Sequence, residues 1–150
     1  AMASSSTSSK RSTPEAFKDP SKGKTLAITQ IAAGADVVFH ASGATGHGVF
    51  EAARDARVFA IGVDSDQYDA MPGTVLTSMV KQVDVALYET IRAVLDSRFK
   101  GGMQVFGARE GGVDYVHAGE HGRLIPPEVN ARVESLRTRL LNGELVAPTE

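Results

Sequence analysis

The sequence contains no cysteine, no long apolar run and no excess of either charge. Without cysteine the chain forms no disulfide, and it has no thiolate to act as a nucleophile or a metal ligand. No segment approaches the roughly 18 apolar residues that a membrane-spanning helix needs, and there is no apolar core of a signal peptide. The formal charge is −2, so the basic stripe of a nucleic-acid-binding surface is not expected.

The length of 150 residues fits one domain. Ala1–Thr13 is rich in serine and threonine and has no apolar periodicity, so we expect a disordered tail or an added leader, with the folded unit over 14–150. Asp19 and Pro20 predict the N-cap and first turn of a helix, which we expect to stop near Gly34.

Four short apolar runs predict strands, and the first two carry apolar residues on both faces. They are Ala35–Ala41, Val58–Val63, Val75–Met79 and Met103–Ala108. Apolar residues at helical spacing predict further helices over Thr45–Asp55, over Val80–Leu95 and after Pro126 and Pro127. Helices that alternate with such strands are typical of a parallel sheet covered on both faces, so the predicted fold class is α/β.

A glycine-rich turn follows the first predicted strand. Gly43, Gly46 and Gly48 are spaced G-x-x-G-x-G, whereas dinucleotide-binding loops have G-x-G-x-x-G and a Walker loop ends in Gly-Lys-Ser/Thr. The residues therefore do not favour a phosphate site. Two interpretations stay open: a tight strand-to-helix turn, and a turn whose backbone N–H groups and Ser42 hydroxyl bind a ligand oxygen.

Polar groups follow three of the predicted strands, at the edge where open parallel sheets bind ligands. Ser42 and Gly43 follow the first strand, Asp64 the second and Lys81 the third. Asp64 can accept hydrogen bonds from a diol, and Lys81 can donate to an oxygen or pair with Asp64. Spacing alone favours such a ligand site no more than a salt bridge at a sheet edge.

Aromatic residues and histidines lie near the same edge. Phe39 belongs to a strand and is expected in the core, although beside the edge its ring can stack on a planar ligand. His40 is predicted to be structural, because no second histidine or carboxylate stands at metal-ligand spacing, and no metal or other cofactor is expected. His47, His117 and His121 are predicted to be solvated in polar loops.

Longer stretches of the chain resemble a known family. GVDSDQ followed by VLTSMVKQVDVALYETI, GGMQVFGAREGGV and NGELVAP resembles, from about Thr13 to Pro148, the basic membrane proteins. These are purine-nucleoside-receptor-like substrate-binding lipoproteins of ABC transporters. The resemblance implies a type I periplasmic-binding fold of two lobes with a nucleoside between them. This chain would be a truncated C-terminal lobe with flavodoxin-like layering, without the first lobe and the first two strands of the second.

The resemblance also implies roles for individual residues. By position, Asp64 and Lys81 bind the ribose hydroxyls, Ser42 and Gly43 line the pocket, and Phe39 (or, as the alternative, the neighbouring histidine) stacks on the base. The implied ligands are inosine, guanosine or adenosine, and the implied partner is the permease of an ABC transporter. A periplasmic or extracellular, lipid-anchored location is implied as well, although the sequence has no lipobox cysteine.

Other functions fit the residues less well. A receiver-like phosphotransfer domain uses acids such as Asp64 and Asp66, a hydroxyl such as Thr77 or Ser78, and a lysine such as Lys81. Here the hydroxyl and the lysine are almost adjacent, whereas that chemistry takes them from successive strands. We find no nucleophile–base pair, so no enzyme is expected. A folded fragment without activity is the remaining alternative.

The helix predicted over Val80–Leu95 bears an apolar stripe. Its members Val83, Leu87, Ile91 and Val94 are, by the resemblance, packed on the first lobe. Two arrangements would cover the stripe: the helix folds back onto its own sheet as a flavodoxin-like layer, or two chains pair through this helix or an exposed edge of the sheet. Of the two we expect the homodimer, because folding back must also protect the open edge.

Overall fold

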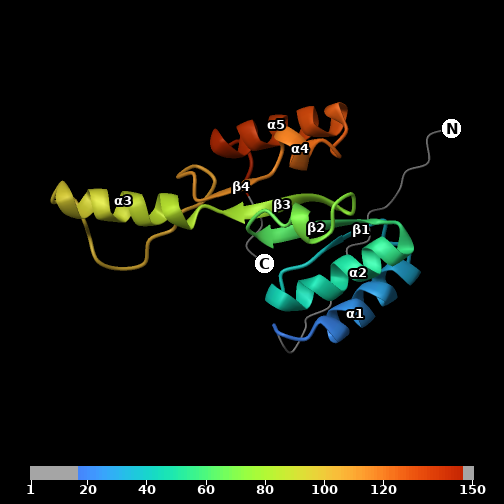
Figure 1. Ribbon diagram of the computed structural model, residues 1–150. Helices are drawn as coiled ribbons and strands as arrows, with labels where there is room; N and C mark the ends of the chain where they lie inside the picture. Colours follow the sequence, from blue (N-terminus) through green and yellow to red (C-terminus); the bar gives the residue numbers. More distant parts are fainter. Residues whose placement is uncertain (1–16, 147–150) are drawn as a thin grey trace.

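The computed structural model describes residues 17–146, which form a four-stranded sheet with helices on both faces (Figure 1). The strands are β1 (Val37–Phe39), β2 (Phe59–Asp64), β3 (Val75–Lys81) and β4 (Val113–Tyr115), in that spatial order. β1, β2 and β3 are parallel, and β4 is antiparallel to β3. The α/β class is confirmed, but the sheet is mixed. The predicted leader Ala1–Thr13 lies outside the described residues.

Two helices cover one face of the sheet: α1 (Pro20–Ala32) and α2 (Gly46–Ala56). As predicted, Asp19 caps α1, because its carboxylate accepts a hydrogen bond of 3.0 Å from the Lys22 amide. A Cβ at Gly48 would overlap the carbonyl oxygen of Pro20, so this glycine lets the two helices pack closely. A short 3-10 turn, η1 (Gly43–Thr45), leads into α2.

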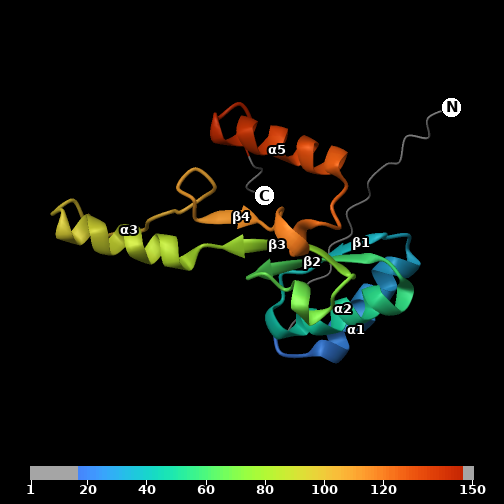
Figure 2. The same ribbon diagram turned by 45° about the horizontal axis from the view of Figure 1, so that its top comes forward.

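The core lies between these helices and the sheet. Its fully buried members include Phe50, Val38 and Val75. On the opposite face Val37 is 39% and Phe39 56% exposed, so the prediction that the first strand is buried on both faces is wrong. The reason is that α5 (Pro127–Leu141) lies over β3 and β4, where it forms an apolar groove of about 420 Å³, and does not reach β1 (Figure 2).

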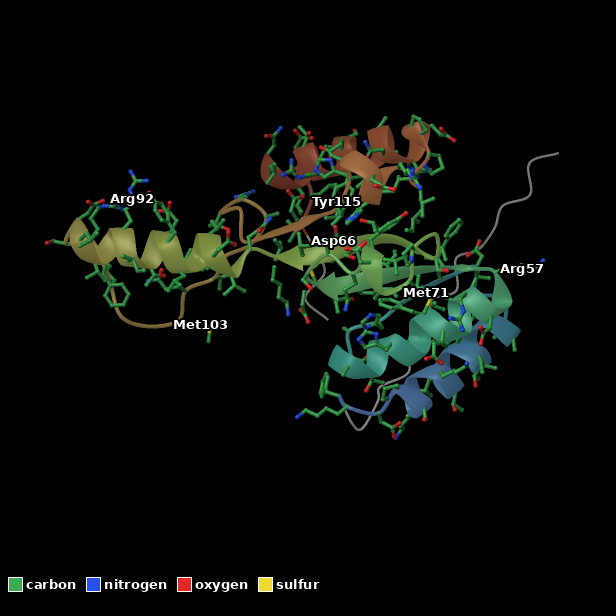
Figure 3. The ribbon with its side chains drawn as sticks, in the orientation of Figure 1. Arg57, Asp66, Met71, Arg92, Met103 and Tyr115 are labelled. Carbon is green, nitrogen blue, oxygen red and sulfur yellow. The ribbon has the colours of Figure 1, made fainter. Side chains whose placement is uncertain are left out.

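The fourth strand is not where the apolar pattern predicts it. No strand forms over 103–108, where Met103 is 96% and Val105 77% exposed, and Met103 points away from the fold in Figure 3. The strand that pairs with β3 is Val113–Tyr115. Its position follows from the turn at Gly111, whose φ is +69°, since this turn returns the chain to β3.

The helix predicted over Val80–Leu95 begins later, because Val80 and Lys81 belong to β3. This helix, α3 (Val83–Leu95), has no buried residue and extends away from the sheet (Figure 1). Two short elements complete the described part, η2 (Tyr68–Ala70) after β2 and α4 (Gly119–Gly122) after β4. The helix predicted after Pro126 is present as α5.

Candidate binding site

The carboxyl ends of β1, β2 and β3 lie at one edge of the sheet because these strands are parallel. Beside this edge is an open hollow of about 540 Å³. Residues 64–66 at the end of β2, 80–82 at the end of β3, and 114–118 from β4 and the segment behind it line the hollow. The position matches the place where open α/β sheets bind ligands.

Asp64 and Lys81 meet at this edge, with 2.7 Å between the Asp64 Oδ1 and the Lys81 Nζ. Both side chains are 55% exposed, and an exposed ion pair of this kind adds little to stability. Asp64 has a φ of +70°, a left-handed conformation that non-glycine residues rarely adopt. Such backbone outliers gather at functional sites, so this residue is the first candidate for a ligand contact.

Two other carboxylates line the hollow, and both are fully engaged. Asp66 accepts from the Tyr68 amide at 3.0 Å and lies 2.6 Å from His121 Nδ1. Asp114 accepts from the Tyr115 amide at 2.9 Å and from Arg137 at 3.2 Å. Within residues 17–146, Oδ2 of Asp64 has no such partner, so Asp64 and Lys81 keep hydrogen-bonding capacity for a ligand.

His121 holds one wall of the hollow in place. It stacks on Tyr68 with ring centroids 4.4 Å apart, and its hydrogen bond with the Asp66 carboxylate raises the pKa of the imidazole. The prediction that His121 lies in a loop is wrong, because it belongs to α4, which carries it against the segment after β2. Its side chain is still 34% exposed, so the predicted contact with solvent is kept. His117 lines the hollow and lies 4.8 Å from the Tyr115 ring. His47 is exposed on α2, with its ring edge toward Phe50.

The opposite wall is fixed by α5. The Tyr115 hydroxyl donates to Glu134 at 2.7 Å and hydrogen-bonds Asn130 at 3.0 Å. Partial burial, together with the Glu134 carboxylate, raises the pKa of Tyr115 to about 12. Figure 3 shows Tyr115 and Asp66 in the space between the sheet and the layer of α4 and α5. The Tyr115 hydroxyl therefore fixes α5 to β4 through its hydrogen bonds to Glu134 and Asn130.

The residues predicted after β1 lie outside the hollow. Ser42 is buried, with its hydroxyl 3.4 Å from Nδ1 of His40, and Gly43 begins η1 with a φ of +54°. Phe39 presents an exposed ring on the uncovered face of the sheet. His40 is 5% exposed, packs edge-on against Phe50, and has its pKa lowered by burial. Only Phe39 of these four offers a large free surface.

Sequence reasoning missed a hydrogen-bonded pair beneath the edge, the partly buried Gln67 and the buried Ser78. The side-chain Oε1 of Gln67 accepts from the backbone amide of Val63 at 2.8 Å, and the backbone amide of Gln67 donates to the Ser78 hydroxyl at 3.0 Å. Ser78 is fully buried. The available signal was a serine inside an apolar strand. The Thr77 hydroxyl donates to the Val116 carbonyl at 2.6 Å, so both hydroxyls of the receiver-like alternative are engaged elsewhere.

Comparison with known proteins gives a consistent family. Residues 10–148 match the model of the Bmp family, described as ABC transporter substrate-binding protein PnrA-like. The chain is 33% identical over 149 residues to the CD4+ T-cell-stimulating antigen of Listeria monocytogenes, covering 88% of this chain and 41% of that protein. It is 32% identical over 136 residues to Basic membrane protein A of Borreliella afzelii, with coverage of 88% and 41%.

A solved structure shows the same fold. An ABC transporter solute-binding protein from Aeropyrum pernix K1 superposes with a TM-score of 0.71 at 27% identity, over 90% of this chain and 46% of that one. The chain thus spans about two fifths of the length of the curated relatives it matches.

Proposed function

Because the chain belongs to the Bmp family of PnrA-like ABC transporter substrate-binding proteins, we propose that it binds a purine nucleoside at the carboxyl ends of β1, β2 and β3. The confirmed family supports a small-molecule ligand, and the purine nucleoside is our choice within it. The pair of Asp64 and Lys81 carries the proposal, because an acceptor and a donor lie side by side with unused capacity.

A ribose diol suits this pair. Oδ2 of Asp64 accepts from one hydroxyl, and the Lys81 ammonium donates to the oxygen of the other. The exposed ring of Phe39 offers an apolar face to the base. Ser42 and Gly43 lie outside the hollow, so no contact with the nucleoside is proposed for them. One open edge buries only part of a ligand, so we expect a dissociation constant of roughly 1 mM.

NMR titration of ¹⁵N-labelled protein with inosine, guanosine and adenosine tests the proposal. We expect shifts at Asp64, Lys81 and Phe39, and Asp64→Asn to weaken binding about tenfold through loss of a charge-assisted hydrogen bond. Glu128→Gln, an exposed acid in α5, is the matched control and should bind as the wild type does. Absence of shifts at 20-fold excess over the protein would favour a folded fragment without activity.

The partner proposed for the whole protein is an ABC transporter permease, and the proposed location is periplasmic or extracellular with a lipid anchor. The family supports the transporter, and the resemblance to substrate-binding lipoproteins supports the anchor. Along residues 17–146 no helix is both long enough and apolar enough to span a bilayer. Co-purification of the full-length protein with membranes, before and after removal of the lipid, would test the anchor.

For this chain alone, we propose a homodimer through α3. Val83, Leu87, Ile91 and Val94 are between 51% and 68% exposed along one face of the helix. In a two-fold dimer the same surface of both protomers meets, so the apolar face of α3 can be covered by the same face of a second copy of the chain.

A further inference from the structure

Gln67 joins two strands directly beneath the proposed site. Its side-chain Oε1 accepts from the Val63 amide at 2.8 Å, one residue before Asp64. The backbone amide of Gln67 donates at 3.0 Å to the hydroxyl of Ser78, which precedes Lys81 by three residues in β3. One residue therefore ties together the two strands that deliver Asp64 and Lys81.

The groups around Gln67 and Ser78 are packed so closely that no neighbouring acceptor can replace the Gln67 side chain. A Cβ at Gly62 would lie 2.6 Å from the Ser78 hydroxyl and 2.8 Å from Gln67 Oε1, so the absence of a side chain there admits both polar groups. Ser78 is fully buried and Val63 is 4% exposed. Without Gln67 the Val63 amide would lose its acceptor where little water can replace it.

Asp64 needs such a support because of its backbone. Left-handed conformations of non-glycine residues persist only where neighbouring structure fixes them. The Val63 amide bonds to Gln67 on one side of Asp64, and the Ser65 amide donates to the Val63 carbonyl at 2.9 Å on the other. We propose that Gln67 is the positioning residue of the site, holding Asp64 in the left-handed conformation that places its carboxylate against Lys81. Its effect on the ligand rests on the proposed function.

Two variants of similar size separate the hydrogen bond from the packing. Gln67→Met fills the space but offers no strong acceptor, whereas Gln67→Glu keeps an oxygen for the Val63 amide. Gln104→Met, in an exposed loop, is the matched control. The readouts are the hydrogen-exchange rate of the Val63 amide and the one-bond Cα–Hα coupling of Asp64, which differs between positive and negative φ.

We expect Gln67→Met to speed exchange at Val63 about tenfold and to remove the positive-φ signature of Asp64, while Gln67→Glu and Gln104→Met retain both. A folded Gln67→Met protein that keeps the signature would overturn the proposal. If Gln67→Met does not fold, Ser78→Ala removes the other bond with little change in volume. It must loosen Asp64 in the same readouts, or the proposal is wrong.

An inosine titration distinguishes the positioning role of Gln67 from the proposed nucleoside function. If positioning and function are both right, Gln67→Met binds inosine about tenfold more weakly than the wild type and Gln67→Glu restores binding. If no protein binds inosine but Asp64 responds as expected, the nucleoside function fails and the positioning role stands. If the wild type and Gln67→Met bind equally and Asp64 is unchanged, the positioning role fails and the function stands.

Discussion

Replacing Leu87 by glutamine should weaken self-association of this chain. Leu87 is 61% exposed at the middle of the apolar face of α3, between Val83 and Ile91. Glutamine is a good helix former, so the change removes apolar surface from the proposed interface without weakening the helix. Arg92→Gln is the matched control, because Arg92 follows the stripe residue Ile91 by one position and projects from the other side of α3.

The magnitude follows from the exposure of the stripe. Full burial of an aliphatic side chain contributes about 1.5–3 kcal/mol, and these four side chains are 51–68% exposed, so two protomers gain about 7–14 kcal/mol on pairing. Association costs about 4–15 kcal/mol in lost freedom. The two ranges nearly cancel, so we expect a weak dimer, and a dissociation constant on the order of 0.1 mM corresponds to a net gain of about 5 kcal/mol. Losing Leu87 from both protomers removes about 2 kcal/mol or more, which weakens the dimer about thirtyfold.

Sedimentation velocity over a concentration series that brackets this dissociation constant provides the measurement. The wild type and Arg92→Gln should shift from monomer to dimer as concentration rises, and Leu87→Gln should stay monomeric. A wild type that is monomeric at every concentration, or an Arg92→Gln protein that dissociates as readily as Leu87→Gln, would refute the role of this face.

Three further predictions concern stability. Gly48→Ala should destabilise the fold by about 1–3 kcal/mol in urea unfolding, because the new methyl group meets Pro20 of α1. Burial lowers the pKa of His40, so the unfolded chain binds more protons and stability should fall as pH drops below about 6.5; His40→Gln should flatten this dependence in thermal unfolding. The Asp66 carboxylate raises the pKa of His121, so the stability contributed by this ion pair is present at low pH and is lost as the pH rises through the folded-state pKa of His121. His121→Gln should abolish this decrease in stability with rising pH.

Local patterns predicted the elements whose signals lie within a few residues. The cap at Asp19 and the apolar runs of β2 and β3 depend on nearest neighbours, and the structure contains them. Because those strands are parallel, placing Asp64 and Lys81 at one edge required only their positions after a strand. Their role in binding stays a prediction.

The features that sequence reasoning missed depend on distant partners. Met103–Ala108 has the composition of a strand, but within residues 17–146 no neighbouring strand pairs with it, and hydrogen bonds to a neighbour define a strand. β4 is short, and only its pairing with β3 reveals it. His121 meets Asp66 across a separation of 55 residues, which no local spacing encodes.

The antiparallel pairing of β3 and β4 has a consequence for the architecture of the chain. Lys81 and Val113 are paired residues, so the segment 82–112, with α3 inside it, leaves and rejoins the sheet at one point. The segment 82–112 therefore takes the place of the turn that would join β3 and β4 in a simple β-hairpin. A turn of about four residues joining the two strands would lower the loop-closure cost by about 2 kcal/mol and leave every strand pairing intact. The segment that carries α3 is thus a module that can be lengthened, exchanged or deleted independently of the sheet that carries Asp64 and Lys81.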